Sequence, residues 1–167
     1  MAKLVLTAIG DDRRGLVSAL SGAVADHGGN WIEGQMARLA GKFAGIVLVD
    51  IPDAAREAFT DAVGHLGVLD VTVTPADADE RPTGEVLHVE ITGNDRPGIV
   101  REVSSALAAL GVSIEAMNTL TYDAPMGDGK LFGTDALLVL TEGVTPDAVR
   151  AALEGITAEL MVDVLTD

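Results

Sequence analysis

Apolar and polar positions along the chain follow two periods, which occur in the same order twice. Residues 4–9 are almost continuously apolar, as expected for a strand that is buried on both faces. Residues 87–91 alternate apolar with polar residues, as expected for a strand that is buried on one face. Downstream of each, apolar residues recur at the spacing of one helical face; they are Leu16, Val17, Leu20 and Val24 in the first segment, and Ile99, Val100, Val103, Leu107 and Leu110 in the second. The pattern therefore predicts a strand followed by an amphipathic helix at two places.

Each half then predicts two strands, a second helix and a last strand. The strand candidates are separated by turn-forming residues; they are residues 31–39, 43–51 and 68–74 in the first half, and 113–122, 130–141 and 160–165 in the second. Second helices are expected from Asp53 and from Pro146, with Thr145 as the N-cap of the latter. With right-handed crossovers, this β-α-β-β-α-β order predicts an α+β fold of two ferredoxin-like domains, each an antiparallel four-stranded sheet with both helices on one face.

The two halves also share residues. When residues 10–21 are aligned with residues 93–104, six of the twelve positions are identical, where unrelated sequences of ordinary composition share about one. We therefore interpret the chain as a tandem duplication. Between the copies, residues 75–84 are polar, acidic and contain two prolines, which is typical of an exposed linker. The expected divisions are a first domain at residues 1–76, a linker at 77–84 and a second domain at 85–167.

Composition narrows the class of protein. The 167 residues, 48% of them hydrophobic, suffice for two small cores and exclude a disordered chain. No apolar run approaches the roughly 20 residues that span a bilayer, and residues 4–9 are too few for the apolar region of a signal peptide. We therefore expect no membrane insertion and a cytoplasmic location. Because the chain has no cysteine, disulfides, thiolate metal sites and cysteine nucleophiles are excluded.

The charge of the chain is strongly negative. Its 11 basic and 26 acidic residues give a formal net charge of −15, of which −5 falls at or before residue 82 and −10 after it. Direct binding of nucleic acid is not expected, because such binding draws most of its affinity from basic residues on phosphates. The simpler interpretation of the charge is a well-solvated surface, and the alternative is a docking face for a basic partner protein.

Each predicted strand-to-helix corner carries residues suited to a small zwitterionic ligand. A helix N-terminus exposes backbone N–H groups that favour a carboxylate, and glycine there leaves room for a ligand. Asn94 provides a donor and an acceptor, and Asp11 or Asp95 could hold an ammonium group. The candidate ligand-binding residues are Asn94, Asp95, Gly98 and Ile99 in the second copy, and Asp11, Asp12, Gly15 and Leu16 in the first. The alternative is structural: Asp12 and Asp95 cap their helices, and the glycines serve the turns.

These corners carry a family resemblance. Residues 94–100 (NDRPGIV) and 111–115 (GVSIE) resemble the ACT domain, and two such copies cover the chain. The resemblance implies a regulatory, non-enzymatic module without a cofactor that binds a small amino acid, glycine or serine being candidates, at an interface between domains, and that can form homo-oligomers. As a tandem pair without a catalytic domain, the chain resembles the glycine cleavage system transcriptional repressor family. Together with the acidic surface, this implies control of transcription through a DNA-binding partner protein.

The first copy departs from the motif at two places. Arg14 stands where the second copy has Pro97, and residues 34–36 (GQM) differ from residues 117–119 (MNT). The second copy is therefore the stronger candidate for ligand binding.

Other functions find less support in the sequence. The three histidines share no metal-ligand spacing and no Gly-x-Ser-x-Gly turn occurs, so we predict neither a metal site nor catalytic residues. Two alternative functions are an interaction scaffold without a ligand and a small acyl-phosphate hydrolase on the same fold. The hydrolase would hold its anion with Arg13 or Arg96, against the negative charge of the neighbouring Asp12 and Asp95.

Overall fold

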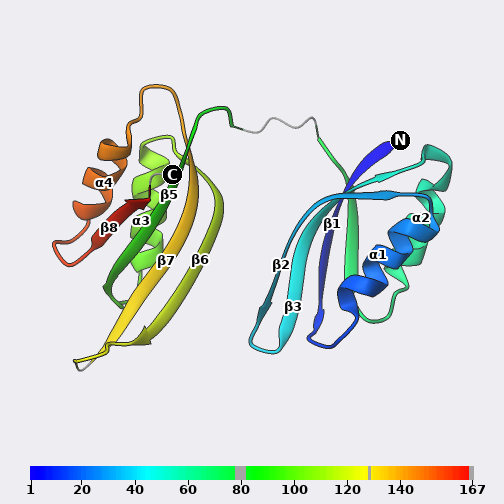
Figure 1. The fold of residues 1–167 in the computed structure, drawn as a ribbon, viewed down its shortest axis with the longest axis horizontal. Coiled ribbons are helices and arrows are strands. Elements are labelled where there is room, and N and C mark those ends of the chain that lie inside the picture. The colour runs from blue at the N-terminus through cyan, green and yellow to red at the C-terminus, as the bar shows by residue number, and fades with distance from the viewer. Residues whose placement is uncertain (78–81, 128, 166–167) are drawn as a thin grey trace. The chain divides into compact units, whose positions relative to one another are not determined.

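Two compact units make up the chain, Met1–Glu80 and Arg81–Asp167 (Figure 1). The structure is a computed structural model that describes residues 1–77, 82–127 and 129–165. Residues 78–81 of the predicted linker lie outside the described residues, so the extent of that linker stays a prediction.

Both units have the element order that the sequence predicts. The first contains β1 (Ala2–Asp11), α1 (Leu16–Asp26), β2 (Asn30–Leu39), β3 (Lys42–Ile51), a 3₁₀ turn η1 (Asp53–Ala55), α2 (Arg56–Gly64) and β4 (Asp70–Pro75). The second contains β5 (Glu85–Asn94), α3 (Ile99–Ala109), β6 (Ser113–Asp123), β7 (Lys130–Leu140), α4 (Pro146–Glu154) and β8 (Met161–Leu165). The sheet orders are β2-β3-β1-β4 and β6-β7-β5-β8, with antiparallel neighbours throughout. The ferredoxin-like α+β prediction is confirmed.

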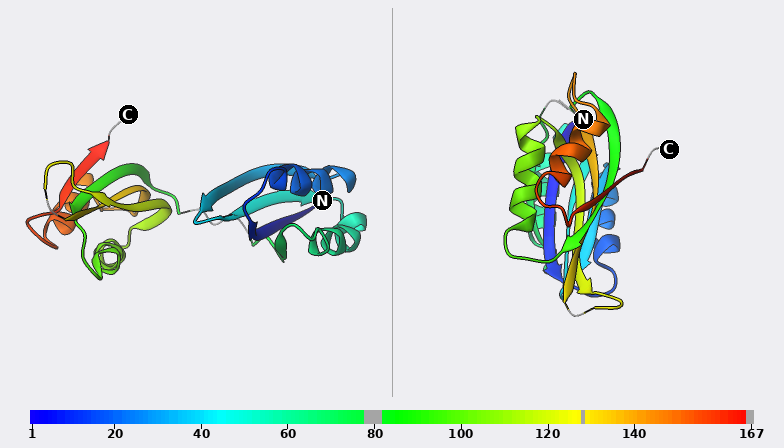
Figure 2. Two further views of the ribbon diagram at one scale, coloured as in Figure 1. Left: turned by 90° about the horizontal axis from the view of Figure 1, so that it is seen from below. Right: turned by 90° about the vertical axis from the view of Figure 1, so that its left-hand side faces the viewer.

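The core of each unit lies between its sheet and its two helices, which cover one face of the sheet (Figures 1 and 2). Alternate side chains of the central strand enter this core; they are Leu4, Leu6 and Ala8 in β1, and Leu87, Val89 and Ile91 in β5. They meet a stripe at four-residue spacing on the first helix, formed by Leu16, Leu20 and Val24 in α1 and by Ile99, Val103 and Leu107 in α3. The predicted apolar faces were too wide, because Val17 and Val100 lie about 100° around the helix and are 45% and 44% exposed.

The second helices begin differently in the two units. Thr145 is the predicted N-cap of α4, and its hydroxyl accepts a hydrogen bond from the Ala148 amide at 3.2 Å. In the first unit, the segment predicted to open a helix at Asp53 forms the 3₁₀ turn instead, and α2 begins three residues later, at Arg56.

In each unit, the helices leave one face of the sheet uncovered, here called the open face. The open faces of the two units differ in chemistry. Cross-strand neighbours Thr7 and Ile46 lie on the open face of the first unit, where the Ile46 side chain is 58% exposed. The equivalent positions of the second unit are Glu90 and Asp135, and Asp163 of β8 lies opposite Glu90 on its other side. At these equivalent positions, the open face of the first unit has a threonine beside an isoleucine, whereas that of the second has three carboxylates on adjacent strands.

Removal of the Phe59 ring should destabilise the first unit. Phe59 on α2 is fully buried, and its ring meets that of His27 edge-on, with centroids 5.7 Å apart. We expect Phe59→Ala to lower the free energy of unfolding by about 3–5 kcal/mol. Trp31 on β2 is the only tryptophan of the chain, so its fluorescence during urea unfolding reports on this unit.

The exposed Val17→Ala provides the control for this change and should alter the unfolding free energy by less than about 0.5 kcal/mol. A loss below about 1 kcal/mol for Phe59→Ala would contradict a packed core around this ring.

Candidate functional site

The loop between the first strand and the first helix has the same backbone geometry in both units. In the second unit, the Asp95 amide donates a hydrogen bond to the Lys130 carbonyl at 2.9 Å; in the first, the Asp12 amide donates to the Gly41 carbonyl at 2.9 Å. Each loop is thereby fastened to the hairpin beside it, and the helix N-terminus that follows it has a fixed position.

A glycine in the left-handed conformation ends each loop. Gly15 has φ 90° and Gly98 has φ 91°, a region that residues with a Cβ seldom adopt. A Cβ placed on either glycine would meet no atom within 4 Å. The backbone at the start of α1 and α3 therefore faces open space, as close approach of a ligand requires.

These glycines are also the N-cap residues of α1 and α3, and neither helix has a side-chain hydrogen bond at its cap. The interpretation that Asp12 and Asp95 serve as helix caps is therefore wrong. Each aspartate lies three residues before its glycine, so the left-handed turn stands between its carboxylate and the helix start.

A pocket of about 320 Å³ opens beside this corner in the second unit. It is lined by the loop, the start of α3 and the strands β6 and β7, through Asp95, Arg96, Gly98, Ile99, Val100, Thr119, Leu120, Thr121 and Phe132. The volume is at the lower end of the range for ligand sites, about 300–1,000 Å³, so the pocket suits a small molecule.

The lining combines groups that suit opposite ends of a zwitterion. The first amides of α3 and the helix dipole favour a carboxylate, while the Asp95 carboxylate favours a cation. Thr119 and Thr121 add hydroxyl groups that can donate or accept, and Phe132 adds an apolar wall. This arrangement suits the binding and orientation of a small polar molecule.

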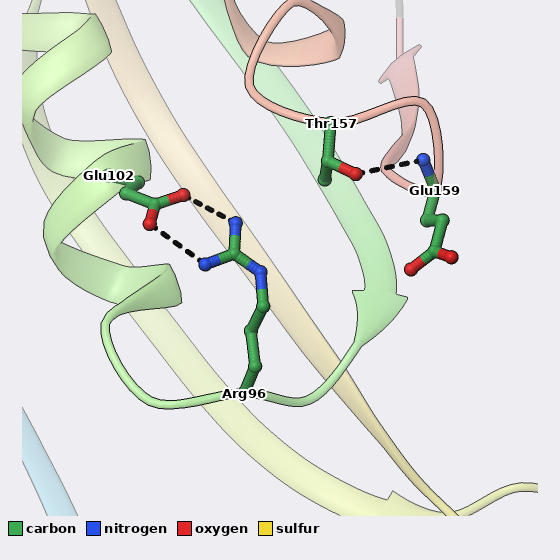
Figure 3. A network of polar contacts seen from close by, with 4 residues as sticks. All are labelled: Arg96, Glu102, Thr157 and Glu159. Atoms are coloured by element: carbon green, nitrogen blue, oxygen red, sulfur yellow. Dashed lines mark hydrogen bonds and ion pairs between the residues drawn. The ribbon is translucent and has the colours of Figure 1, made fainter.

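The guanidinium of Arg96 forms an ion pair within the second unit. Its two terminal nitrogens donate to the two carboxylate oxygens of Glu102 on α3, at 2.8 and 2.5 Å (Figure 3). These hydrogen bonds raise the pKa of Arg96 and lower the pKa of Glu102. The pair fixes the loop against the first turn of α3 and neutralises most of the positive charge beside the pocket.

Of the residues predicted for the second copy, Asp95, Gly98 and Ile99 line the pocket and Asn94 does not. The side-chain amide of Asn94 donates a hydrogen bond to the Glu159 carboxylate at 2.9 Å. Glu159 stands on the loop before β8, where its backbone amide donates to the Thr157 hydroxyl (Figure 3). Asn94 therefore ties the end of β5 to this loop.

In the first unit the predicted carboxylates have cationic neighbours. Asp11 pairs with Lys42 across the strands β1 and β3, which lowers the pKa of Asp11 and raises that of Lys42. Asp12 pairs with Arg38 of β2 at 3.2 Å. Gly15 begins α1, and the Leu16 side chain is buried in the core.

Sequence reasoning did not predict six lining residues as ligand-binding residues: Arg96 and Val100 within the repeated motif, and Thr119, Leu120, Thr121 and Phe132 on the sheet. The four on the sheet are separated from the loop by more than 20 residues and reach the pocket only because β6 and β7 pair beside α3. The alternation of Thr119 and Thr121 in β6 signals a shared face, but nothing local indicates that this face meets the loop.

Two other site classes find no support in the part of the chain that the structure describes. No group of three or more histidine, aspartate and glutamate side chains there could hold a metal ion. No helix among residues 1–77, 82–127 and 129–165 is long and apolar enough to cross a membrane.

Comparisons with known proteins agree with the fold described above. Residues 2–66 match the family model of the ACT domain, and no curated protein matches the sequence. The structure is similar to an unknown protein from Galdieria sulphuraria, with a TM-score of 0.84 and 24% identity over 98% of this chain and 96% of that one. It is also similar to a proposed glycine cleavage system transcriptional repressor, with a TM-score of 0.74 and 15% identity over 99% of this chain and 98% of that one. At these identities the structural likenesses show the fold.

The Arg96–Glu102 pair should make stability depend on pH. Because the pKa of Glu102 is lowered in the folded state, its stabilising effect is present above the ordinary glutamate pKa of about 4.3 and is lost as the pH falls through the lowered value. We expect Glu102→Gln to unfold at a lower temperature than the unsubstituted protein at neutral pH, with the difference shrinking towards about pH 3.

Thermal unfolding across this pH range measures the effect, and Glu142→Gln, an exposed glutamate on the loop before α4, provides the control. A difference between Glu102→Gln and the unsubstituted protein that stays constant with pH would contradict the ion pair.

Proposed function

The chain is a tandem pair of ACT-like domains, the first of which matches the ACT family model, and we propose that it is a non-enzymatic regulatory protein that binds a small amino acid in the pocket of its second unit. The observation that carries the proposal is the pocket beside Gly98, where helix amides and the Asp95 carboxylate border one small volume. A free α-amino acid has a carboxylate and an ammonium group on one carbon, so it can satisfy both at once.

The size and lining of the pocket favour a ligand with a short side chain. Thr119 and Thr121 offer hydroxyl groups to a polar side chain, and the Phe132 ring restricts its bulk. Glycine and serine fit these limits and are the proposed ligands. A structural relative described as a proposed glycine cleavage system transcriptional repressor is consistent with the same ligand class.

We propose that regulation acts through a protein partner. With a formal charge of −15, the chain repels phosphate backbones, so control of gene expression, glycine cleavage genes included, would require a DNA-binding partner. A ligand shifts such a complex only by its difference in affinity for the free and bound states.

The alternatives are a ligand-independent scaffold and an acyl-phosphate hydrolase. The pocket favours ligand binding over the scaffold. The bidentate pairing of Arg96 with Glu102 opposes the hydrolase, because it removes the guanidinium that an acyl phosphate would need. The adjacent Asp95 adds repulsion against that anion.

Binding can be tested by thermal unfolding in the presence of each of the twenty amino acids at millimolar concentration. A ligand that binds only the folded state stabilises it by about 2.7 kcal/mol at a hundred times its dissociation constant. We expect a selective rise in the unfolding midpoint with glycine or serine. No rise with any amino acid would contradict the proposal and favour the scaffold.

Gly98→Val should abolish this rise, because the added side chain projects into the open space at the start of α3. The substitution also forces a β-branched residue into the left-handed region, at a cost of about 1–2 kcal/mol. Gly143→Val is a matched control, since Gly143 lies on the loop before α4 with φ 85°, and a Cβ added there would also meet no atom within 4 Å. Both variants should lose stability, but Gly143→Val should keep the ligand-dependent rise.

Asp95→Asn should weaken binding by roughly 10- to 100-fold, because it removes the charge from a hydrogen bond worth about 1.5–3 kcal/mol. Isothermal titration calorimetry with the amino acid that gives the largest midpoint rise measures the change. Asp163→Asn, an exposed aspartate on the open face, should bind as the unsubstituted protein does. Unchanged affinity in Asp95→Asn would exclude Asp95 as the partner of the ammonium group.

A further inference from the structure

The strand registers show which residues occupy equivalent positions at the two corners. In the first unit Arg38 pairs with Phe43, which pairs with Gly10; in the second, Thr121 pairs with Phe132, which pairs with Gly93. Gly10 and Gly93 begin the repeated motif, so Arg38 is the counterpart of Thr121.

The same registers make Met36 the counterpart of Thr119, two residues earlier on the same face. The first unit therefore has two long side chains where the second unit has two threonines that line its pocket. Met36 packs partly buried against the core of the first unit. Arg38 extends to the loop, where a terminal nitrogen lies 3.2 Å from the carboxylate of Asp12.

Asp12 is in turn the counterpart of Asp95, the proposed partner of the ligand's ammonium group. Its side chain is only 28% exposed, whereas that of Arg38 is 71% exposed. The carboxylate of Asp12 is thus partly shielded from solvent and paired with a guanidinium. Arg38 supplies from within the chain the cation that Asp95 would receive from a ligand.

We infer that Arg38 closes the first unit to amino acids, so that one chain binds one ligand, at the second unit. The inference rests on the proposed function and adds its stoichiometry and the residue that sets it. Two effects act together: the Arg38 and Met36 side chains fill the space that Thr121 and Thr119 leave open, and the guanidinium repels an incoming ammonium group. The corner of the first unit therefore keeps its structural role, and the charge of its Asp12 carboxylate is paired with Arg38 of the same chain.

The test is the number of ligands bound per chain, measured by isothermal titration calorimetry with glycine, with serine and with any other amino acid that raises the unfolding midpoint. The unsubstituted protein should bind one. The double variant Met36→Thr/Arg38→Thr, which gives these two positions the residues of the second unit, should bind two. The single variant Arg38→Thr tests the same idea without altering the core, and should gain measurable weaker binding at a second site.

Arg56→Thr makes the same chemical change on α2, away from the corner, and should leave one ligand per chain. In the double variant, added Gly98→Val should leave one ligand, bound at the first unit, and Trp31 fluorescence verifies that this unit is folded.

The outcomes separate the two proposals. Two ligands on the unsubstituted chain, or one ligand on both folded Arg38 variants, would overturn the closure by Arg38 and leave the proposed function standing. No binding of any amino acid to the unsubstituted chain would overturn the proposed function and this inference with it.

Discussion

Burial of one face of the central strand is the constraint on which the rest of each unit depends. β1 and β5 each have a strand on both sides, and their inward side chains are among the most enclosed in the molecule. Two helices must cover this face, because apolar area removed from water supplies most of the favourable free energy of folding. The connection from the central strand to the first helix therefore has to turn sharply within four residues, and that turn creates the corner beside which the pocket lies.

The corner combines stability and recognition in one backbone. The left-handed glycine lets the chain reverse onto the sheet, and the same absence of a Cβ leaves the helix amides accessible. Around it, polar side chains of the second unit are paired with one another: Arg96 with Glu102, and Asn94 with Glu159. Such pairing holds the loop in place in the absence of a ligand, so little ordering is required on binding. The carboxylate of Asp95 borders the remaining space.

Much of this architecture can be predicted from the sequence. The same physical reasons explain why the other features cannot. Periodicity identified the helices and strands because burial acts on each residue locally, and the repeated Gly15 and Gly98 located both corners because few other residues tolerate that backbone. The pocket walls escaped notice because Thr119 and Thr121 reach the loop only through the pairing of β6 with β7. Asp12 and Asp95 match the sequence signature of a cap, but the intervening left-handed turn separates them from the helix, a matter of three-dimensional geometry.

The contrast between the open faces bears on how a duplicated chain avoids exchanging its halves while it folds. Copies with the same topology offer each other compatible strands, and tandem domains are prone to such misassembly. If β7 entered the first sheet beside β1, Asp135 would take the place of Ile46 opposite Thr7 and lose its contact with His88. In the reverse exchange, Ile46 would lie opposite Glu90. The buried faces are predominantly apolar in both copies, so the charged solvent-facing pairs of the second unit add a difference by which the chain distinguishes its own strands from their duplicates.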